Sequence, residues 1–227
     1  QREIAKFDAL AARWWDLEGD FKPLHEINPL RANWIDQYSP VVGKKLLDVG
    51  CGGGILAEAM AQRGASVTGI DMAEAALNVA ELHKLESGLD VDYRLSTAEG
   101  LADTSPETYD IVCCLEMLEH VPNPDRVVAA CADLAKPGAD LYFSTINRNP
   151  KSFLFAIVGA ERILRLLPAG THEYEMLIRP SERGSWLRAA GLRMERMTGL
   201  SYNPISKRYR LIEDDVSVNY MVHATKL

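Results

Sequence analysis

Residues 47–54 read L-D-V-G-C-G-G-G, and this stretch constrains the fold more than any other. An apolar run leads into it, and glycine stands at every second position, at Gly50, Gly52 and Gly54. Glycine adopts positive φ values freely and lets a ligand approach the backbone, because no Cβ stands in the way. A helical pattern begins at Ile55. We therefore predict a buried strand that leaves its sheet through a tight loop, which opens onto a helix N-terminus.

The loop differs from the glycine loops that bind phosphates. The dinucleotide fingerprint G-x-G-x-x-G needs glycine or alanine where this chain has Ile55, which disfavours an NAD-dependent dehydrogenase. No G-x-x-x-x-G-K-[ST] run occurs, so a P-loop is excluded. The form D-x-G-x-G-x-G, which begins at Asp48, resembles the first motif of Rossmann-like methyltransferases that use S-adenosylmethionine. That cofactor lacks phosphate, but its amino-acid end needs hydrogen-bond partners and its sulfonium favours nearby negative charge.

A second acid ends the next predicted strand, at Asp71. It follows the first glycine by about 20 residues, the interval at which an acid binds the ribose hydroxyls in βαβ nucleoside sites. Taken alone, an aspartate at a strand end is better explained as a helix N-cap, so the prediction depends on its interval from the glycine loop. We place Asp48, Gly50, Gly52, Asp71 and the adjoining Met72 in the predicted cofactor site.

Composition limits the class of protein. The chain has 227 residues, a net charge of −7 and an isoelectric point near 5.3, with no basic tail, which argues against a nucleic-acid substrate. No apolar run approaches the roughly 20 residues of a membrane span. The four cysteines form no C-x-x-C pair and predict reduced core residues of a cytoplasmic protein. They are Cys51, Cys113, Cys114 and Cys131.

Strand and helix patterns alternate along the chain and predict one α/β domain over residues 1–227. It has a helical cap at 1–40 and an insertion at 148–180. We expect a Rossmann-like, mostly parallel, seven-stranded sheet with helices on both faces and an antiparallel hairpin at its edge. The predicted strands are 45–50, 66–71, 91–96, 109–115, 140–145, 192–199 and 216–225. The predicted helices are 3–18, 29–38, 55–63, 73–86, 124–135 and 181–190.

The segment E-M-L-E-H-V-P, residues 116–122, follows the fourth predicted strand. In open α/β sheets the ligand lies beyond the carboxyl ends of the strands, so Glu116, Glu119 and His120 point toward the cleft. On a helix these three residues share a face at spacings of three and four. Two carboxylates and an imidazole suit Mg²⁺, Mn²⁺ or Zn²⁺. By spacing alone, a solvated turn with one buried polar residue explains the segment better.

Seven blocks that span nearly the whole chain resemble the ubiquinone-biosynthesis O-methyltransferase family, which methylates ring hydroxyls of polyprenylated phenols. The glycine motif is common to many methyltransferases, whereas the R-W-W-D-L, N-P-L-R and Y-N-P-I sequences are far narrower. The blocks are R-W-W-D-L-E-G (13–19), F-K-P-L-H-x-I-N-P-L-R (21–31), L-D-V-G-C-G-G-G-I-L-A-E (47–58), E-M-L-E-H-V-P (116–122), S-T-I-N-R-N (144–149), G-L-x-Y-N-P-I (199–205) and V-N-Y-M (218–221).

The resemblance implies roles for particular residues. Arg31 and Leu115 would contact the cofactor together with Gly50 and Asp71, and the Arg31 guanidinium matches the fork of a carboxylate. Family members commonly carry methionine where this chain has Leu115, and leucine keeps the apolar wall.

The resemblance also implies a divalent metal, Mg²⁺ or else Mn²⁺ or Zn²⁺, at Glu116, Glu119 and His120, and catalytic roles for His120 and Glu119. A metal on the ring oxygen would lower the phenol pKa, which is about 10 when unperturbed. Some relatives use a histidine here as general base, so His120 is either ligand or base.

The implied substrate, a polyprenylated phenol or catechol, dissolves in lipid. Residues 151–168 are too short and too charged to span a bilayer, but on a helix they leave a wide apolar arc. We expect this segment to lie on an anionic membrane surface, with a core helix or a lid as alternatives. The protein would then be cytoplasmic, peripheral on the inner face of the plasma membrane, and a candidate for a ubiquinone-biosynthesis complex.

Two rival functions remain open. A related methyltransferase could act on another small hydroxyl, amine or carboxyl compound, and only product analysis separates it. A non-catalytic assembly protein would bind S-adenosylmethionine without transferring its methyl group.

Overall fold

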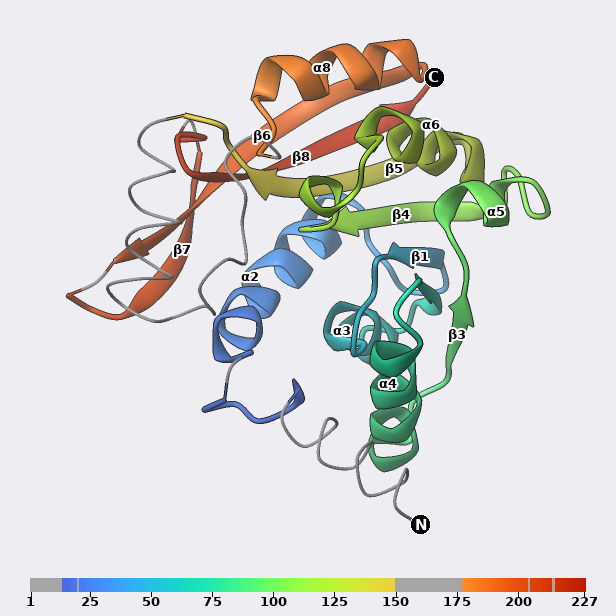
Figure 1. The fold of residues 1–227 in the computed structure, drawn as a ribbon, viewed down its shortest axis with the longest axis vertical. Coiled ribbons are helices and arrows are strands. Elements are labelled where there is room, and N and C mark those ends of the chain that lie inside the picture. The colour runs from blue at the N-terminus through green and yellow to red at the C-terminus, as the bar shows by residue number, and fades with distance from the viewer. Residues whose placement is uncertain (1–13, 20, 150–176, 204, 214) are drawn as a thin grey trace.

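The structure, a computed structural model, describes residues 14–19, 21–149, 177–203, 205–213 and 215–227. In this part of the chain eight strands form one sheet, in the order β3-β2-β1-β4-β5-β8-β6-β7 (Figure 1). The strands are β1 (Lys45–Val49), β2 (Ser66–Asp71), β3 (Val91–Leu95), β4 (Tyr109–Leu115), β5 (Ala135–Ile146), β6 (Leu192–Asn203), β7 (Arg208–Glu213) and β8 (Asn219–Lys226).

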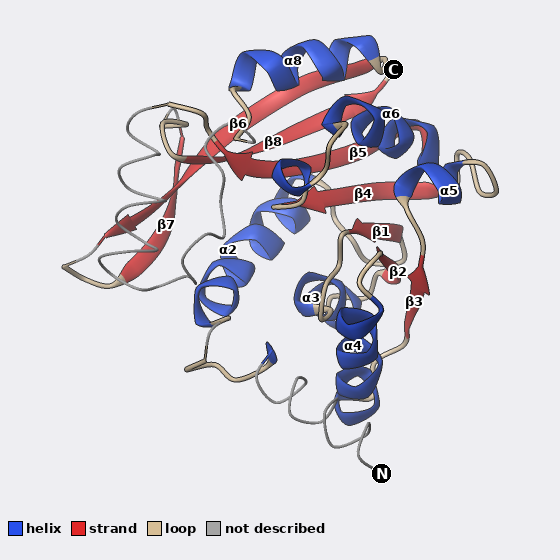
Figure 2. Ribbon diagram, in the orientation of Figure 1, coloured by secondary structure: helices blue, strands red, loops and turns tan. Residues whose placement is uncertain are grey.

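Helices cover both faces of the sheet. Figure 2 shows α2, α3 and α4 on one side and α5, α6 and α8 on the other. This arrangement confirms the predicted fold class, a Rossmann-like α/β sheet. The described helices are α2 (Lys22–Tyr38), α3 (Ile55–Gln62), α4 (Glu74–Ser87), α5 (Ala98–Ala102), α6 (Pro124–Leu134) and α8 (Pro180–Ala189), with a short 3-10 helix, η1 (Leu118–His120).

Successive residues of the central strands belong to two different cores. Leu46 and Cys113 pack in the cluster beneath α2 and α3, whereas Leu47 and Cys114 pack in the cluster beneath α6 and α8. Side chains alternate between the faces of a strand, so a strand covered on both faces must be apolar throughout. This explains why the central strands appear in the sequence as continuous apolar runs.

The closing strands differ from the prediction in number and position. The sheet has eight strands rather than seven, because β6 runs on to Asn203 and pairs with the unpredicted β7. The antiparallel edge hairpin is therefore β6–β7. The strand β8 lies inside the sheet, antiparallel to both β5 and β6.

The N-terminal and insertion predictions are only partly covered by the described residues. Helix α2 begins at Lys22, seven residues before the predicted start at Pro29, and Pro29 lies inside it. Most of the predicted helix at 3–18 and the whole segment 151–168 lie outside the described residues, so the division into cap, domain and insertion stays a prediction. Among the described helices, none is both long and apolar enough to cross a membrane.

Candidate functional site: a glycine loop between acidic side chains

The glycine loop connects β1 to α3 and is fixed by backbone hydrogen bonds to β2. The N–H groups of Gly50 and Cys51 both donate to the Ile70 carbonyl, at 2.8 and 3.0 Å. Gly50, Gly52 and Gly54 have φ values of 75°, 53° and 88°. These values lie in the left-handed region, which favours glycine, so the spacing of the motif follows from the backbone geometry of the turn.

Asp71 at the end of β2 joins the glycine loop to the start of α4. Its Oδ2 accepts a hydrogen bond from Gly52 N at 2.8 Å, and its Oδ1 accepts one from Ala73 N at 2.8 Å. Each carboxylate oxygen has a second lone pair, so both can also accept a ligand hydroxyl. The next residue, Met72, is 65 % exposed and can offer an apolar surface to a ligand beside Asp71.

Asp48 lies beneath the loop and is 3 % exposed. Burial, and next the negative charge of Asp71, raise the pKa of Asp48 to about 7, although a backbone hydrogen bond from Ala57 and the charge of Arg31 act in the opposite direction. Its Oδ2 atom has no hydrogen-bond partner in the described part of the chain. A buried acceptor without a partner is costly, and a cationic ligand would supply the missing partner charge.

Arg31 reaches from α2 across to Glu116, at the carboxyl end of β4. Its Nη2 atom lies 2.6 Å from Glu116 Oε1, and the arginine side chain is nearly buried. The hydroxyl of Ser144 donates to the same oxygen at 2.6 Å, and Asn219 donates to Glu116 at 3.1 Å. The Arg31 Nε atom is buried and has no hydrogen-bond partner in the described residues.

The segment after β4 is not the regular helix that the spacing of Glu116, Glu119 and His120 predicts. Glu116 has a φ of 53°, and only Leu118–His120 form one 3-10 turn. Glu116 bonds to Ser144, whereas Glu119 lies beside the next residue of β5, Thr145. Successive residues of a strand point to opposite faces of the sheet, so the two carboxylates lie on opposite sides of β5.

Glu119 is a buried core residue, 3 % exposed. Burial, and next the charge of Glu116, raise the pKa of Glu119 to about 8, despite lowering contributions from its own backbone N–H, Thr145 and Arg183. The Arg183 side chain of α8 lies over the Tyr220 ring at 4.6 Å, and its nitrogens have no hydrogen-bond partner in the described structure. The raised pKa favours the uncharged form of this carboxyl group inside the core.

The predicted metal set is therefore not brought together. Within the described ranges, no group of three His, Cys, Asp or Glu side chains is arranged to hold a metal ion. Glu116 instead contacts Arg31, and Glu119 lies inside the core. His120 ends η1 as an exposed side chain beyond the carboxyl end of β4. Leu115 is half-buried against the cluster beneath α2 and α3, consistent with an apolar wall.

Three residues of this site escaped the sequence analysis. Ser144 and Asn219 hold Glu116 from β5 and β8. Met117 covers Gly50 so closely that a Cβ added there would lie 2.7 Å from the Met117 Cγ atom. The blocks S-T-I-N-R-N and V-N-Y-M contain Ser144 and Asn219 and could have drawn attention to both. Met117 likewise lies in the block E-M-L-E-H-V-P, although its contact with Gly50 depends on the fold.

The ionisable groups around the loop are predominantly acidic. Arg31 pairs with Glu116 and interacts with the charge of Asp48, which in turn interacts with Asp71. S-adenosylmethionine carries an ammonium, a sulfonium and one carboxylate, so its net positive charge complements this set. The fold and the site define a Rossmann-like methyltransferase dependent on S-adenosylmethionine.

Similarity to known proteins identifies the family of the chain more narrowly. Residues 24–197 match the methyltransferase-domain family. The chain is 65 % identical to a ubiquinone biosynthesis O-methyltransferase of Saccharophagus degradans, over 99 % of this chain and 95 % of that protein. It is 64 % identical to the protein of the same name from Stutzerimonas stutzeri, over 99 % of this chain and 96 % of that one.

A solved structure shares the fold. It is the magnesium protoporphyrin IX methyltransferase of Synechocystis with bound S-adenosylhomocysteine, which is 19 % identical, with a TM-score of 0.66 over 89 % of this chain and 83 % of the other. The chain belongs to the ubiquinone biosynthesis O-methyltransferase family.

Proposed function

We propose that the chain transfers the methyl group of S-adenosylmethionine to a ring hydroxyl of a polyprenylated phenol or catechol in ubiquinone biosynthesis. The observation that carries the proposal is the glycine loop flanked by Asp48, Asp71 and the Arg31–Glu116 pair. The names of the relatives supply the pathway and the kind of acceptor.

In this proposal the chain holds and orients the cofactor. Asp71 would accept hydrogen bonds from the ribose hydroxyls, and the Arg31 guanidinium would pair with the cofactor carboxylate. Asp48 and Glu116 supply negative charge for the ammonium and sulfonium. When bound, the cofactor supplies an electrophilic methyl group. Fixing its direction lets the acceptor oxygen approach in line, and such positioning is a large part of catalysis in two-substrate reactions.

His120 is the proposed general base. A phenol has a pKa of about 10 and an imidazole about 6.5, so the His120 ring nitrogen would need to take the hydroxyl proton while the acceptor reacts, rather than before it. The exposed position of His120 at the end of η1 supports this role. The resemblance implies a catalytic role for Glu119 as well, but its carboxyl group is buried in the core, where it does not face solvent. We assign Glu119 to the packing of η1.

A divalent metal has no step in this proposal, because the carboxylates of Glu116 and Glu119 lie on opposite sides of β5. Chelation is the direct test, and we expect turnover to survive it. Loss of turnover that Mg²⁺, Mn²⁺ or Zn²⁺ restores would mean that η1 rearranges during the reaction and that Arg31 releases Glu116.

Membrane contact through residues 151–168 also remains a proposal. It rests on the composition of that segment and on the lipid solubility of the proposed acceptor. A position on the inner face of the plasma membrane and membership of a ubiquinone-biosynthesis complex belong to the same proposal. Changing Phe153, Phe155 and Ile157 to serine should reduce sedimentation with anionic liposomes but leave turnover of a short-tail acceptor intact. If the wild-type protein does not sediment with anionic liposomes at low salt, the proposed membrane contact is wrong.

The decisive experiment follows labelled methyl transfer to a short-tail polyprenyl catechol, with products identified by mass spectrometry. Asp71→Ala should weaken cofactor binding about tenfold or more, since it removes hydrogen bonds to a charged group. Asp90→Ala, an exposed acid between α4 and β3, is the matched control and should bind normally. Cofactor binding without any transfer would favour a non-catalytic assembly protein, and transfer only to other acceptors would favour a different substrate.

A further inference from the structure

Two adjacent tryptophans just before α2 contact the glycine loop. The indole of Trp14 packs directly against Gly52 and Gly53. A Cβ added at Gly52 would lie 2.9 Å from the Trp14 Cζ2 atom, and one added at Gly53 would collide with the same ring. Gly53 has no positive φ, so its backbone alone does not require glycine. The missing side chain at Gly53 makes room for an indole.

Trp15 also contacts the glycine loop, and it packs against α4 as well. Its Nε1 donates to the Gly53 carbonyl at 3.1 Å. Its ring stacks on His83 of α4, with centroids 3.5 Å apart and planes 3° from parallel. The Nδ1 atom of His83 lies 2.9 Å from both carboxylate oxygens of Glu58, a buried residue in the first turn of α3. Trp15 therefore connects the loop to the helices that follow both β1 and β2.

Trp14 is itself held in place by the start of α2. Its ring stacks on Phe21, with centroids 4.1 Å apart. The Nε2 atom of His25 donates to the Trp14 carbonyl, at 2.9 Å. These contacts with Phe21 and His25 fix the orientation of the Trp14 ring, so the glycine loop packs against a rigid side chain.

We propose that Trp14 and Trp15 are positioning residues for S-adenosylmethionine, which fix the glycine loop in the conformation that binds the cofactor. The inference rests on the proposed cofactor site. Glycine is the most conformationally free residue, so a loop with four of them loses much entropy when a ligand orders it. Contacts that order the loop beforehand reduce this cost and strengthen binding.

A double-mutant cycle at Gly53 and Trp14 tests the contact, with calorimetric Kd values for S-adenosylmethionine as the readout. Gly53→Ala should raise the Kd about tenfold in the wild-type background, because the new methyl group displaces the indole. In a Trp14→Ala background the same change should have little further effect, because the colliding ring is gone. A Gly53→Ala effect of equal size in both backgrounds would mean that the ligand, not Trp14, needs the space.

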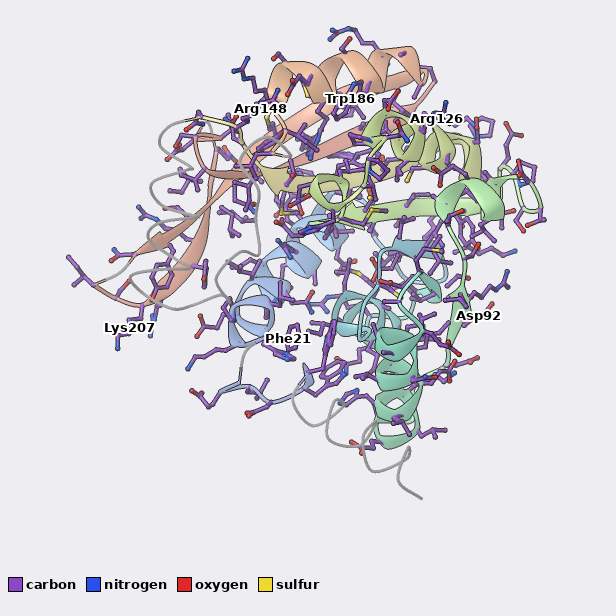
Figure 3. All side chains as sticks on the ribbon, viewed as in Figure 1. Phe21, Asp92, Arg126, Arg148, Trp186 and Lys207 are labelled. Atoms are coloured by element: carbon purple, nitrogen blue, oxygen red, sulfur yellow. The ribbon has the colours of Figure 1, made fainter. Side chains whose placement is uncertain are left out.

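Trp15→Phe separates positioning from folding. Phenylalanine keeps a ring on His83 but loses the N–H bond to Gly53, so the KM for S-adenosylmethionine should rise about fivefold. The kcat, the KM for the acceptor and the melting temperature should stay near wild type. Trp186→Phe is the matched control, since Trp186 lies on α8, on the other side of the sheet from Phe21 (Figure 3).

The outcomes distinguish this proposal from the assignment of the site. Normal binding by Asp71→Ala would refute the site itself. Weakened binding by Asp71→Ala combined with normal binding by Trp14→Ala and Trp15→Phe would refute only the positioning role. Tighter binding by Trp14→Ala would also refute it, since the indole would then occupy the place of the cofactor.

Discussion

Replacing Asp48 with asparagine should stabilise the protein and, at the same time, weaken its binding of S-adenosylmethionine. The aspartate is buried beneath the glycine loop, where its charged form lacks a partner for one oxygen in the described structure. Asparagine has nearly the same shape and no charge. The charge therefore costs stability in the free protein and is useful only when a cationic ligand is bound.

The size of the effect follows from the pKa of Asp48, which burial raises from 3.8 to about 7. A folded-state pKa above the unfolded value means that the folded protein binds the proton more tightly. The contribution of Asp48 to the free energy of unfolding is thus fully present below about pH 4, where the carboxyl group is protonated. It is lost as the pH rises through about 7 and the buried group becomes charged. The full difference corresponds to about 4 kcal/mol. The variant should gain less, about 1–3 kcal/mol, because a buried amide also loses hydration.

The assay is urea unfolding of both proteins without cofactor, at about pH 5 and about pH 8.5. The stability advantage of Asp48→Asn should be about 2 kcal/mol larger at the higher pH, and calorimetry should show weaker cofactor binding there. An advantage that does not change with pH would show that Asp48 titrates normally, and the argument from its burial would be wrong.

Other perturbations test the remaining parts of the site and the core. His120→Gln should lower kcat by about 10²–10⁴-fold with an unchanged Kd for the cofactor, and a smaller loss would exclude general-base catalysis. Glu116→Gln should weaken the bond to Arg31 and raise the Kd for the cofactor about tenfold, measured by calorimetry. Burial opposes ionisation of Asp140, but hydrogen bonds from His223 and Ser39 outweigh it and lower its pKa, so its stabilising effect is present above about pH 4 and lost in acid. Asp140→Asn should cost about 1–3 kcal/mol at neutral pH in thermal unfolding, with turnover unchanged at permissive temperature.

The part of the sheet in which strands and helices alternate along the chain was predictable from the sequence. The apolar run before Gly50 and the strand that ends at Asp71 lie where the patterns place them, because a strand buried on both faces must be apolar throughout. The glycine spacing also predicted the turn, since left-handed φ values restrict the choice of residue.

Features set by tertiary contacts were not predictable. The left-handed φ of Glu116 turns the chain after β4, and residue spacing assumes a regular helix in its place. The bond from Asn219 to Glu116 joins residues 103 positions apart. The strand β7 was missed because its pairing with β6 depends on the hairpin rather than on an apolar pattern of its own. The role of Gly53 is likewise set by an indole 39 residues earlier in the chain, at Trp14.

The position of β8 affects how the sheet is completed during synthesis. The strand follows β6 and β7 in the chain, yet it lies between β5 and β6 and pairs with both. Among the described strands, β5 keeps an unpaired edge until β8 leaves the ribosome, and β6 and β7 join the other strands through β8. Exposed strand edges pair readily with other chains. The nascent protein is therefore prone to aggregate until β8 emerges, and slow translation of residues 219–226 would prolong this period.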